Sequence, residues 1–84
     1  MVVKALGRYI VTDSAICHGQ PTFRGTRILV SDVLEQVANG MVWEAIIEEW
    51  HGKLTEEEIA EAVRLAREAL AAHAKEFVLE PIDV

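Results

Sequence analysis

The chain has 84 residues and a mass of 9.3 kDa, which leaves room for one small domain and excludes a two-domain enzyme. Apolar residues make up 51% and charged residues 26% of the sequence, a balance that excludes a disordered chain and a membrane-spanning one. The single cysteine cannot form an internal disulfide and no signal-peptide pattern is evident, so we expect a cytoplasmic protein with no membrane contact.

The net charge of −6 is unevenly distributed along the chain. Residues 1–30 carry four basic side chains against one acidic one, whereas residues 31–84 carry four against thirteen, a local charge of −9. An acidic surface repels phosphate and attracts basic proteins. Any contact with nucleic acid is therefore expected through the N-terminal segment.

Residues 9–30 are predicted to form a β-hairpin with a long connecting loop. Tyr9–Thr12 and Ile28–Val30 are runs of β-branched or aromatic residues bounded by Gly, Asp and Pro, which is typical of short strands. The loop over residues 17–27 contains two glycines and a proline, which impose special backbone angles. Because two short strands alone are marginal in water, this segment should pack on helices or complete a sheet with a second copy of the chain.

Two short helices are predicted next. The first has a helical stripe of apolar residues, begins at a capping Ser31 and ends near Asn39. The second begins at Trp43, where Val42 occupies the position of the usual polar cap, and ends near His51. Since each tryptophan side chain buries on the order of 200 Å², we expect the two tryptophans to dominate the helical core.

A long third helix is predicted to begin at the capping box Thr55–Glu58. Its apolar stripe runs from Ile59 to Phe77. The acidic side chains of its first turns, including Glu61, are expected to be solvated and to favour the positive end of the helix dipole rather than to act in catalysis. The apolar face is wider than two short helices can cover, so we expect a partner.

The loop between the predicted strands carries the strongest candidate for a binding site. Arg24 and Arg27 flank Gly25-Thr26, which brings two planar cations close to free loop amides. Two interpretations are open at this point. The arginines could bind a phosphate or carboxylate, or they could bond carbonyls of their own loop or the acidic helices and lock the strand in place.

Cys17 and His18 are adjacent, but their arrangement does not predict metal binding or catalysis. The other histidines, His51 and His73, are dispersed, so the spacing of a structural zinc site is missing. Neighbouring side chains in an extended segment point to opposite faces, which disfavours a Cys–His catalytic pair. We expect no catalytic residue, no metal site and no cofactor.

These segments together resemble a known family. The run from Ile16 to Ile28 (ICHGQPTFRGTRI) closely resembles the bacterial and archaeal domains of unknown function catalogued as DUF433, as do several downstream positions. Those positions are Val30, Gly40-Met41, Ile46, Leu54-Thr55, Ile59 and Ala62. The similarity covers about residues 9–70. The family motif falls on Gly19, Pro21, Arg24, Gly25, Thr26 and Arg27.

The resemblance implies a mainly α fold in a single domain. Its body would be a trihelical, homeodomain-like helix-turn-helix bundle over residues 31–76, preceded by the hairpin of residues 9–30 and followed by an apolar tail over residues 77–84. Members of the family are described as VapB-like antitoxins, often found beside a PIN-like ribonuclease toxin. The resemblance brings no catalytic residue.

Two functions are therefore predicted. The first is a non-enzymatic antitoxin that neutralises a PIN-like ribonuclease through its acidic helical surface and its tail, with Phe77, Val78, Leu79 and Ile82 as docking residues. The alternative is a homodimeric helix-turn-helix regulator that contacts DNA phosphates through Arg24 and Arg27, with its own operon as one candidate target. The acidic residues in the first turns of the third helix disfavour direct reading of DNA bases by this helix.

Overall fold

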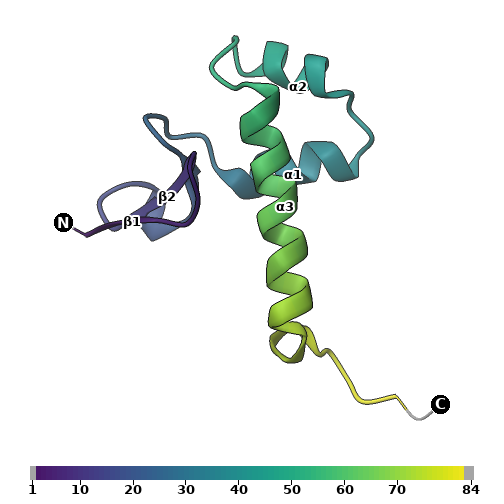
Figure 1. Ribbon diagram of the computed structural model, residues 1–84. Coiled ribbons are helices and arrows are strands. Elements are labelled where there is room, and N and C mark those ends of the chain that lie inside the picture. Colours follow the sequence, from purple (N-terminus) through teal and green to yellow (C-terminus); the bar gives the residue numbers. More distant parts are fainter. Residues whose placement is uncertain (1, 83–84) are drawn as a thin grey trace.

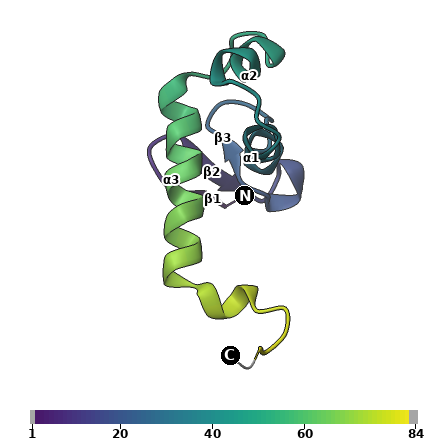
Figure 2. The same ribbon diagram turned by 90° about the vertical axis from the view of Figure 1, so that its right-hand side faces the viewer.

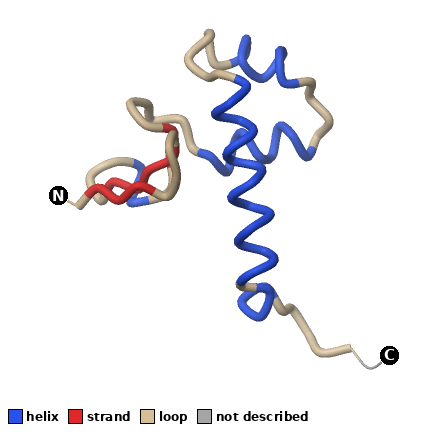
Figure 3. Tube along the Cα trace, in the orientation of Figure 1, coloured by secondary structure: helices blue, strands red, loops and turns tan. Residues whose placement is uncertain are grey.

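The structure is a computed structural model that describes residues 2–82. An antiparallel sheet at the N-terminus precedes three helices (Figures 1 and 3). The sheet has the order β1 (Val3–Ala5), β2 (Ile10–Asp13) and β3 (Thr22–Phe23). The central strand therefore pairs on both sides, and no crossover is needed.

The predicted hairpin is thus only partly right. Its first strand is confirmed as β2, displaced by one residue. Its second strand at Ile28–Val30 is wrong, because the N–H of Phe23 donates to the Ile28 carbonyl (3.2 Å), Leu29 forms only an isolated bridge with Thr22, and Val30 already begins a helix. The sequence also gave no pattern for β1, whose three residues are all exposed.

Helix α1 (Val30–Ala38) starts one residue earlier than predicted, and Ser31 does not cap it. Leu29 occupies the N-cap position and makes no side-chain cap hydrogen bond. The backbone of the preceding loop fixes this start instead, since the N–H of Val30 donates to the Pro21 carbonyl (3.1 Å).

Helix α2 (Trp43–Glu49) confirms the second predicted helix, but its tryptophans do not dominate the core. Trp43 and Trp50 are half-buried and pack against the periphery of the core. The indole N–H of Trp50 donates to the side-chain oxygen of Gln36 (2.7 Å), which ties the end of α2 to α1. A polar bond at the ring edge accounts for the outward position of Trp50.

Helix α3 (Glu56–Ala72) begins with the predicted capping box. Thr55 Oγ1 accepts from the N–H of Glu58 (3.2 Å), and the Glu58 carboxylate accepts from the N–H of Thr55 (3.0 Å). The helix ends at Ala72 rather than Phe77, and a short 3₁₀ turn, η2 (Ala74–Phe77), follows. A backbone bond from Glu76 to the His73 carbonyl closes this turn, and the two side chains meet at 3.1 Å.

The core lies where the sheet meets the helices. Its buried apolar side chains come from β2, β3, the segments before α1 and α3, and all three helices: Ile10, Phe23, Ile28, Val30, Val33, Ile46, Leu54, Ile59 and Ala62. Ile10 stands opposite Phe23 in the register of β2 and β3, so one face of the sheet enters this core. The N-terminal segment therefore packs on the helices of its own chain.

A carboxylate of α3 joins the sheet to the helices at a second point. The Glu61 carboxylate accepts hydrogen bonds from the backbone N–H groups of Arg8 (2.9 Å) and Tyr9 (2.7 Å), in the turn between β1 and β2. A Cβ at Gly7 would lie 2.7 Å from the same carboxylate, so a side chain at this position would have to displace the end of the Glu61 side chain. The expectation that Glu61 is a solvated helix-start residue is wrong, since its partners are 52 and 53 residues away in the chain.

The second half of α3 extends beyond the rest of the molecule. Every residue from Ala66 to Ala72 is exposed, and the C-terminal segment leaves from the end of α3 opposite to α2 (Figures 1 and 2). The Cα radius of gyration is 14.3 Å, whereas a compact domain of this length has one of about 12 Å. Within residues 2–82, no helix is both long and apolar enough to cross a bilayer.

The first prediction concerns the two hydrogen bonds from the Arg8 and Tyr9 N–H groups to Glu61, which we call the Glu61 clamp. Glu61→Ala leaves two backbone donors without their charged acceptor and should lower the free energy of unfolding by about 1–3 kcal/mol. Urea unfolding followed by circular dichroism measures this change. Glu68→Ala, an exposed position on the same helix, is the matched control and should stay within about 0.5 kcal/mol of the parent protein. Equal stability of the two variants would contradict the clamp.

Candidate binding groove and C-terminal arm

We call residues 17–27, which carry most of the family motif, the motif loop. It begins with a run of left-handed backbone. Cys17, His18 and Gly19 have φ angles of 50°, 56° and 77°. Two of these residues are not glycines, and the left-handed region costs a residue with a Cβ roughly 1–2 kcal/mol. Cys17 is half-buried, and its thiol lies 3.7 Å from the Arg27 carbonyl. The start of the loop is thus held against its end.

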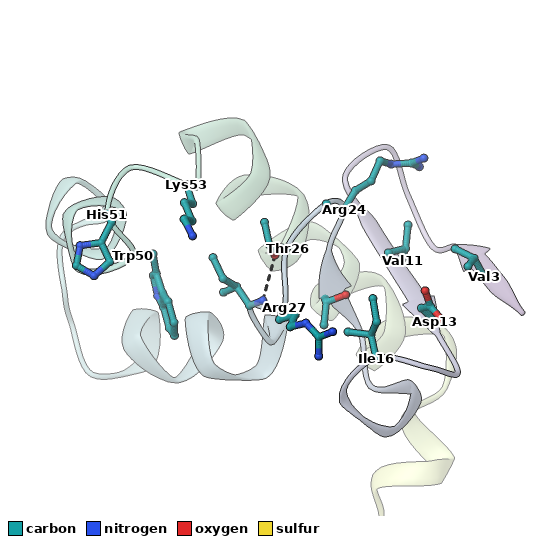
Figure 4. A pocket seen from close by; sticks show the side chains of 13 residues that line it. Val3, Val11, Asp13, Ile16, Arg24, Thr26, Arg27, Trp50, His51 and Lys53 are labelled. Atoms are coloured by element: carbon teal, nitrogen blue, oxygen red, sulfur yellow. Dashed lines mark hydrogen bonds between the residues drawn. The ribbon is translucent and has the colours of Figure 1, made fainter. Parts of the chain in front are cut away.

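Thr26 fixes the turn that follows β3. Its hydroxyl donates to the Phe23 carbonyl (2.8 Å) and accepts from the N–H of Ile28 (3.0 Å), the second bond being the dashed line in Figure 4. Its own N–H also donates to the Phe23 carbonyl (3.0 Å). Gly25 has a φ of +78° with open space around its Cα, so backbone angle and not crowding requires the glycine.

The two motif arginines have different surroundings. The N–H of Arg24 donates to the Tyr9 carbonyl (2.7 Å), and its Nε donates to the Arg8 carbonyl (3.2 Å). This supports the interpretation in which an arginine holds the loop to the neighbouring strand. No side-chain hydrogen bond of Arg27 is present within residues 2–82, and the residue is exposed.

The motif loop forms one wall of a groove with a volume of about 960 Å³. We call this the motif groove. Its other wall is the turn between α2 and α3, with Trp50, His51 and Lys53. In Figure 4, Trp50 and Lys53 stand on one side, strands β1 and β2 lie on the other, and Thr26 and Arg27 lie between them. Its complete lining is Val3, Val11, Asp13, Ile16, Thr22, Arg24, Gly25, Thr26, Arg27, Ile28, Trp50, His51 and Lys53.

The groove combines an apolar floor with basic groups. Arg24, Arg27 and Lys53 line it against the single carboxylate of Asp13, although the chain as a whole carries −6. Among residues 2–82, none of these three cations has an ion-pair partner within 4.0 Å. Because the rest of the protein is mainly acidic, these unpaired cations make the groove the surface where a bound anion would have the most favourable electrostatic energy.

Four of the six predicted motif residues, the consecutive residues 24–27, line the groove. Gly19 and Pro21 do not line it. They act on the loop backbone instead: Gly19 closes the left-handed run, and the Pro21 carbonyl accepts from α1.

Sequence reasoning missed the opposite wall of the groove. Trp50 and Lys53 follow Arg27 by more than twenty residues, and no local pattern links them to the loop. Only the basic character of Lys53, isolated among acidic residues, offered a signal. Within residues 2–82, no group of three His, Cys, Asp or Glu side chains is placed to hold a metal ion.

The predicted docking residues form an exposed segment, Phe77–Ile82, which we call the C-terminal arm. Phe77, Val78, Leu79 and Ile82 are 56%, 65%, 99% and 74% exposed. Glu80 lies within the same segment and is also exposed. The last two residues of the predicted tail, 83–84, lie outside the described residues. The arm thus offers apolar side chains to water, without cover from its own chain.

The fold and the groove define a class of small three-helix domains with an N-terminal three-stranded antiparallel sheet and a glycine- and arginine-containing loop. The family model described as "Protein of unknown function (DUF433)" matches residues 10–66, which include the sheet's central strand, the motif loop and most of the helices. The chain belongs to this family. Neither the curated proteins nor the solved structures gave a match to the sequence.

The second prediction concerns the motif turn. Thr26→Val keeps the side-chain shape but removes the hydroxyl that bonds Phe23 and Ile28, so it should lower the free energy of unfolding by about 1–2 kcal/mol. Thr12→Val, on strand β2, is the control, because no side-chain hydrogen bond of Thr12 is present within residues 2–82. Thermal unfolding of both variants measures the difference, and a neutral Thr26→Val would contradict the role of this hydroxyl.

Proposed function

We propose that this protein is a non-enzymatic, antitoxin-like binding protein that neutralises a PIN-like ribonuclease. The observation that carries the proposal is the C-terminal arm, which holds four exposed apolar side chains beyond the end of a helix whose last described residues, 66–72, are all exposed. A soluble protein gains by covering such a segment against a partner. The arm is long enough to lie across a second protein surface.

Charge favours a basic partner. Residues 31–84 carry −9, and the exposed carboxylates of α2 and of the first turn of α3 form much of this charge. They are Glu44, Glu48, Glu49, Glu56 and Glu57. A ribonuclease must attract RNA, so its surface around the active site is expected to be basic and to complement these carboxylates. We therefore assign the acidic helices to recognition and the arm to tight contact.

The third prediction tests the arm. We expect a PIN-like nuclease to be encoded beside this protein, and co-expression of the two, followed by size-exclusion chromatography at low salt, should give a complex. Leu79→Asp places a charge on the most exposed apolar side chain of the arm and should weaken that complex at least tenfold, about 1.4 kcal/mol.

Val42→Asp is the matched control, because Val42 is an exposed apolar residue (67%) outside the arm, and the complex should survive it. Circular dichroism checks that both variants are folded. Absence of co-elution with the parent protein, or equal loss in the two variants, would overturn the proposal.

A homodimeric regulator with a homeodomain-like, helix-turn-helix body is the second candidate function. The cations of the motif groove favour it, because Arg27 and Lys53 line the groove without an ion-pair partner among residues 2–82 and are available to phosphates. The carboxylates of Glu56 and Glu57 disfavour insertion of α3 into a DNA groove, since base edges are read by Arg, Lys, Asn or Gln. This function therefore ranks below the antitoxin.

The fourth prediction separates the two functions. If the groove contacts phosphates, binding to DNA from upstream of the gene falls steeply as salt is raised, and Arg27→Ala reduces the salt dependence by about one unit of slope. Fluorescence anisotropy measures both quantities. Lys4→Ala, a cation outside the groove, is the control. No binding at low ionic strength removes the regulator.

A further inference from the structure

The motif groove has the surface properties of a peptide-binding site. Its floor is apolar, with Val11, Ile16 and Ile28, and Trp50 adds apolar surface on one wall. Within residues 2–82, the cations at its rim have no ion-pair partner. A ligand that satisfies both parts needs apolar side chains and a carboxylate spaced a few residues apart. A free inorganic anion would leave the floor uncovered.

The same chain contains a segment with this chemistry. In the C-terminal arm, Glu80 follows Phe77, Val78 and Leu79 and precedes Ile82, all of them exposed. The arm is therefore apolar with an interposed acid, whereas the groove is apolar with interposed bases. Each surface lacks what the other supplies.

We propose that the C-terminal arm of one molecule docks in the motif groove of a second copy of this chain. The length of α3 favours docking between molecules. The groove wall at Lys53 precedes the start of α3, the arm follows its other end, and α3 is about 25 Å long (Figure 1). The six residues Phe77–Ile82 span about 20 Å at most when extended, so they do not reach the Lys53 wall of their own groove.

In this arrangement each molecule inserts its arm into the groove of the other, so the assembly is complete with two copies. When two α3 helices lie antiparallel, the arm of each molecule comes beside the turn between α2 and α3 of the other. Such a contact uses the same two surfaces twice, which gives a two-fold symmetric dimer. The exposed end of α3, from Ala66 to Ala72, includes Ala69 and Leu70 and would lie along the partner helix.

Nucleic acid is a less suitable occupant of the groove. A phosphate backbone extends beyond any one groove, and here it would meet Glu48 and Glu49 of α2 and Glu56 of α3, which border the turn that carries Lys53. A short peptide contacts the groove alone. The apolar floor adds to the preference for a peptide, because a phosphate backbone does not cover it.

The fifth prediction uses the full chain alone, so its failure is distinct from failure of the toxin interaction. Light scattering after size-exclusion chromatography should give about twice the 9.3 kDa mass. Arg27→Glu with Lys53→Glu should weaken dimerisation at least tenfold (about 1.4 kcal/mol), and so should Glu80→Lys. Combining all three changes should restore the dimer, because the charges again match with exchanged signs. Lys4→Glu, a cation outside the groove, should leave the dimer intact.

A second measurement reports on the groove directly. In a full-length variant with Trp43→Phe and Glu80→Lys, whose own arm should no longer dock, Trp50 is the only remaining tryptophan, and it lines the groove. A synthetic peptide of residues 76–84 should change its emission, whereas a scrambled peptide should not. Three outcomes would each overturn the proposal. They are a monomeric parent protein, a dimer whose stability does not change with the charge substitutions, and a Trp50 emission that responds to a short oligonucleotide but not to the peptide.

Discussion

The bond between the Glu61 carboxylate and the turn of Arg8 and Tyr9 sets the geometry on which the rest of this protein depends. It fixes the sheet to α3 from outside the core, while Ile10 and Phe23 fix it from within. The motif groove has one wall on the sheet side and the other at the end of α2. The width of the groove therefore depends on how the sheet sits on the helices, which the Glu61 hydrogen bonds and the buried pair Ile10 and Phe23 fix together.

Features set by neighbouring residues were predictable from the sequence, and features set by distant contacts were not. The capping box at Thr55 is complete within four residues, so the start of α3 was correctly predicted. The end of α3 was not, because residues 66–72 are all exposed and the apolar period continues past Ala72 without structural consequence. Strand β3 is not predictable from the sequence for two reasons. Its two residues, Thr22-Phe23, show no strand pattern of their own, and their pairing depends on the turn that Thr26 stabilises.

The candidate site divides in the same way. The glycine and arginine motif is visible in sequence because loop geometry demands unusual residues close together. The structure then separates its two arginines, because Arg24 donates to the carbonyls of Arg8 and Tyr9 before β2, whereas Arg27 is exposed and lines the groove. Lys53 and Trp50 complete the site through packing of α2 on α1, where the bond between Trp50 and Gln36 holds the indole in place. No short-range pattern encodes that juxtaposition.

The distribution of charge has a consequence for any partner of the arm. The basic groups of the groove and the acidic, apolar arm stand at opposite ends of α3, a rigid spacer that keeps them apart within one molecule. If copies exchange arms, a foreign protein must displace a neighbouring groove before it takes the arm, and its apparent affinity falls as the concentration of this protein rises. If they do not, the apolar segment is free at all concentrations and its exposure alone favours capture. Exchange of arms between copies, and not the arm's exposure alone, thus decides whether the arm is available to a partner.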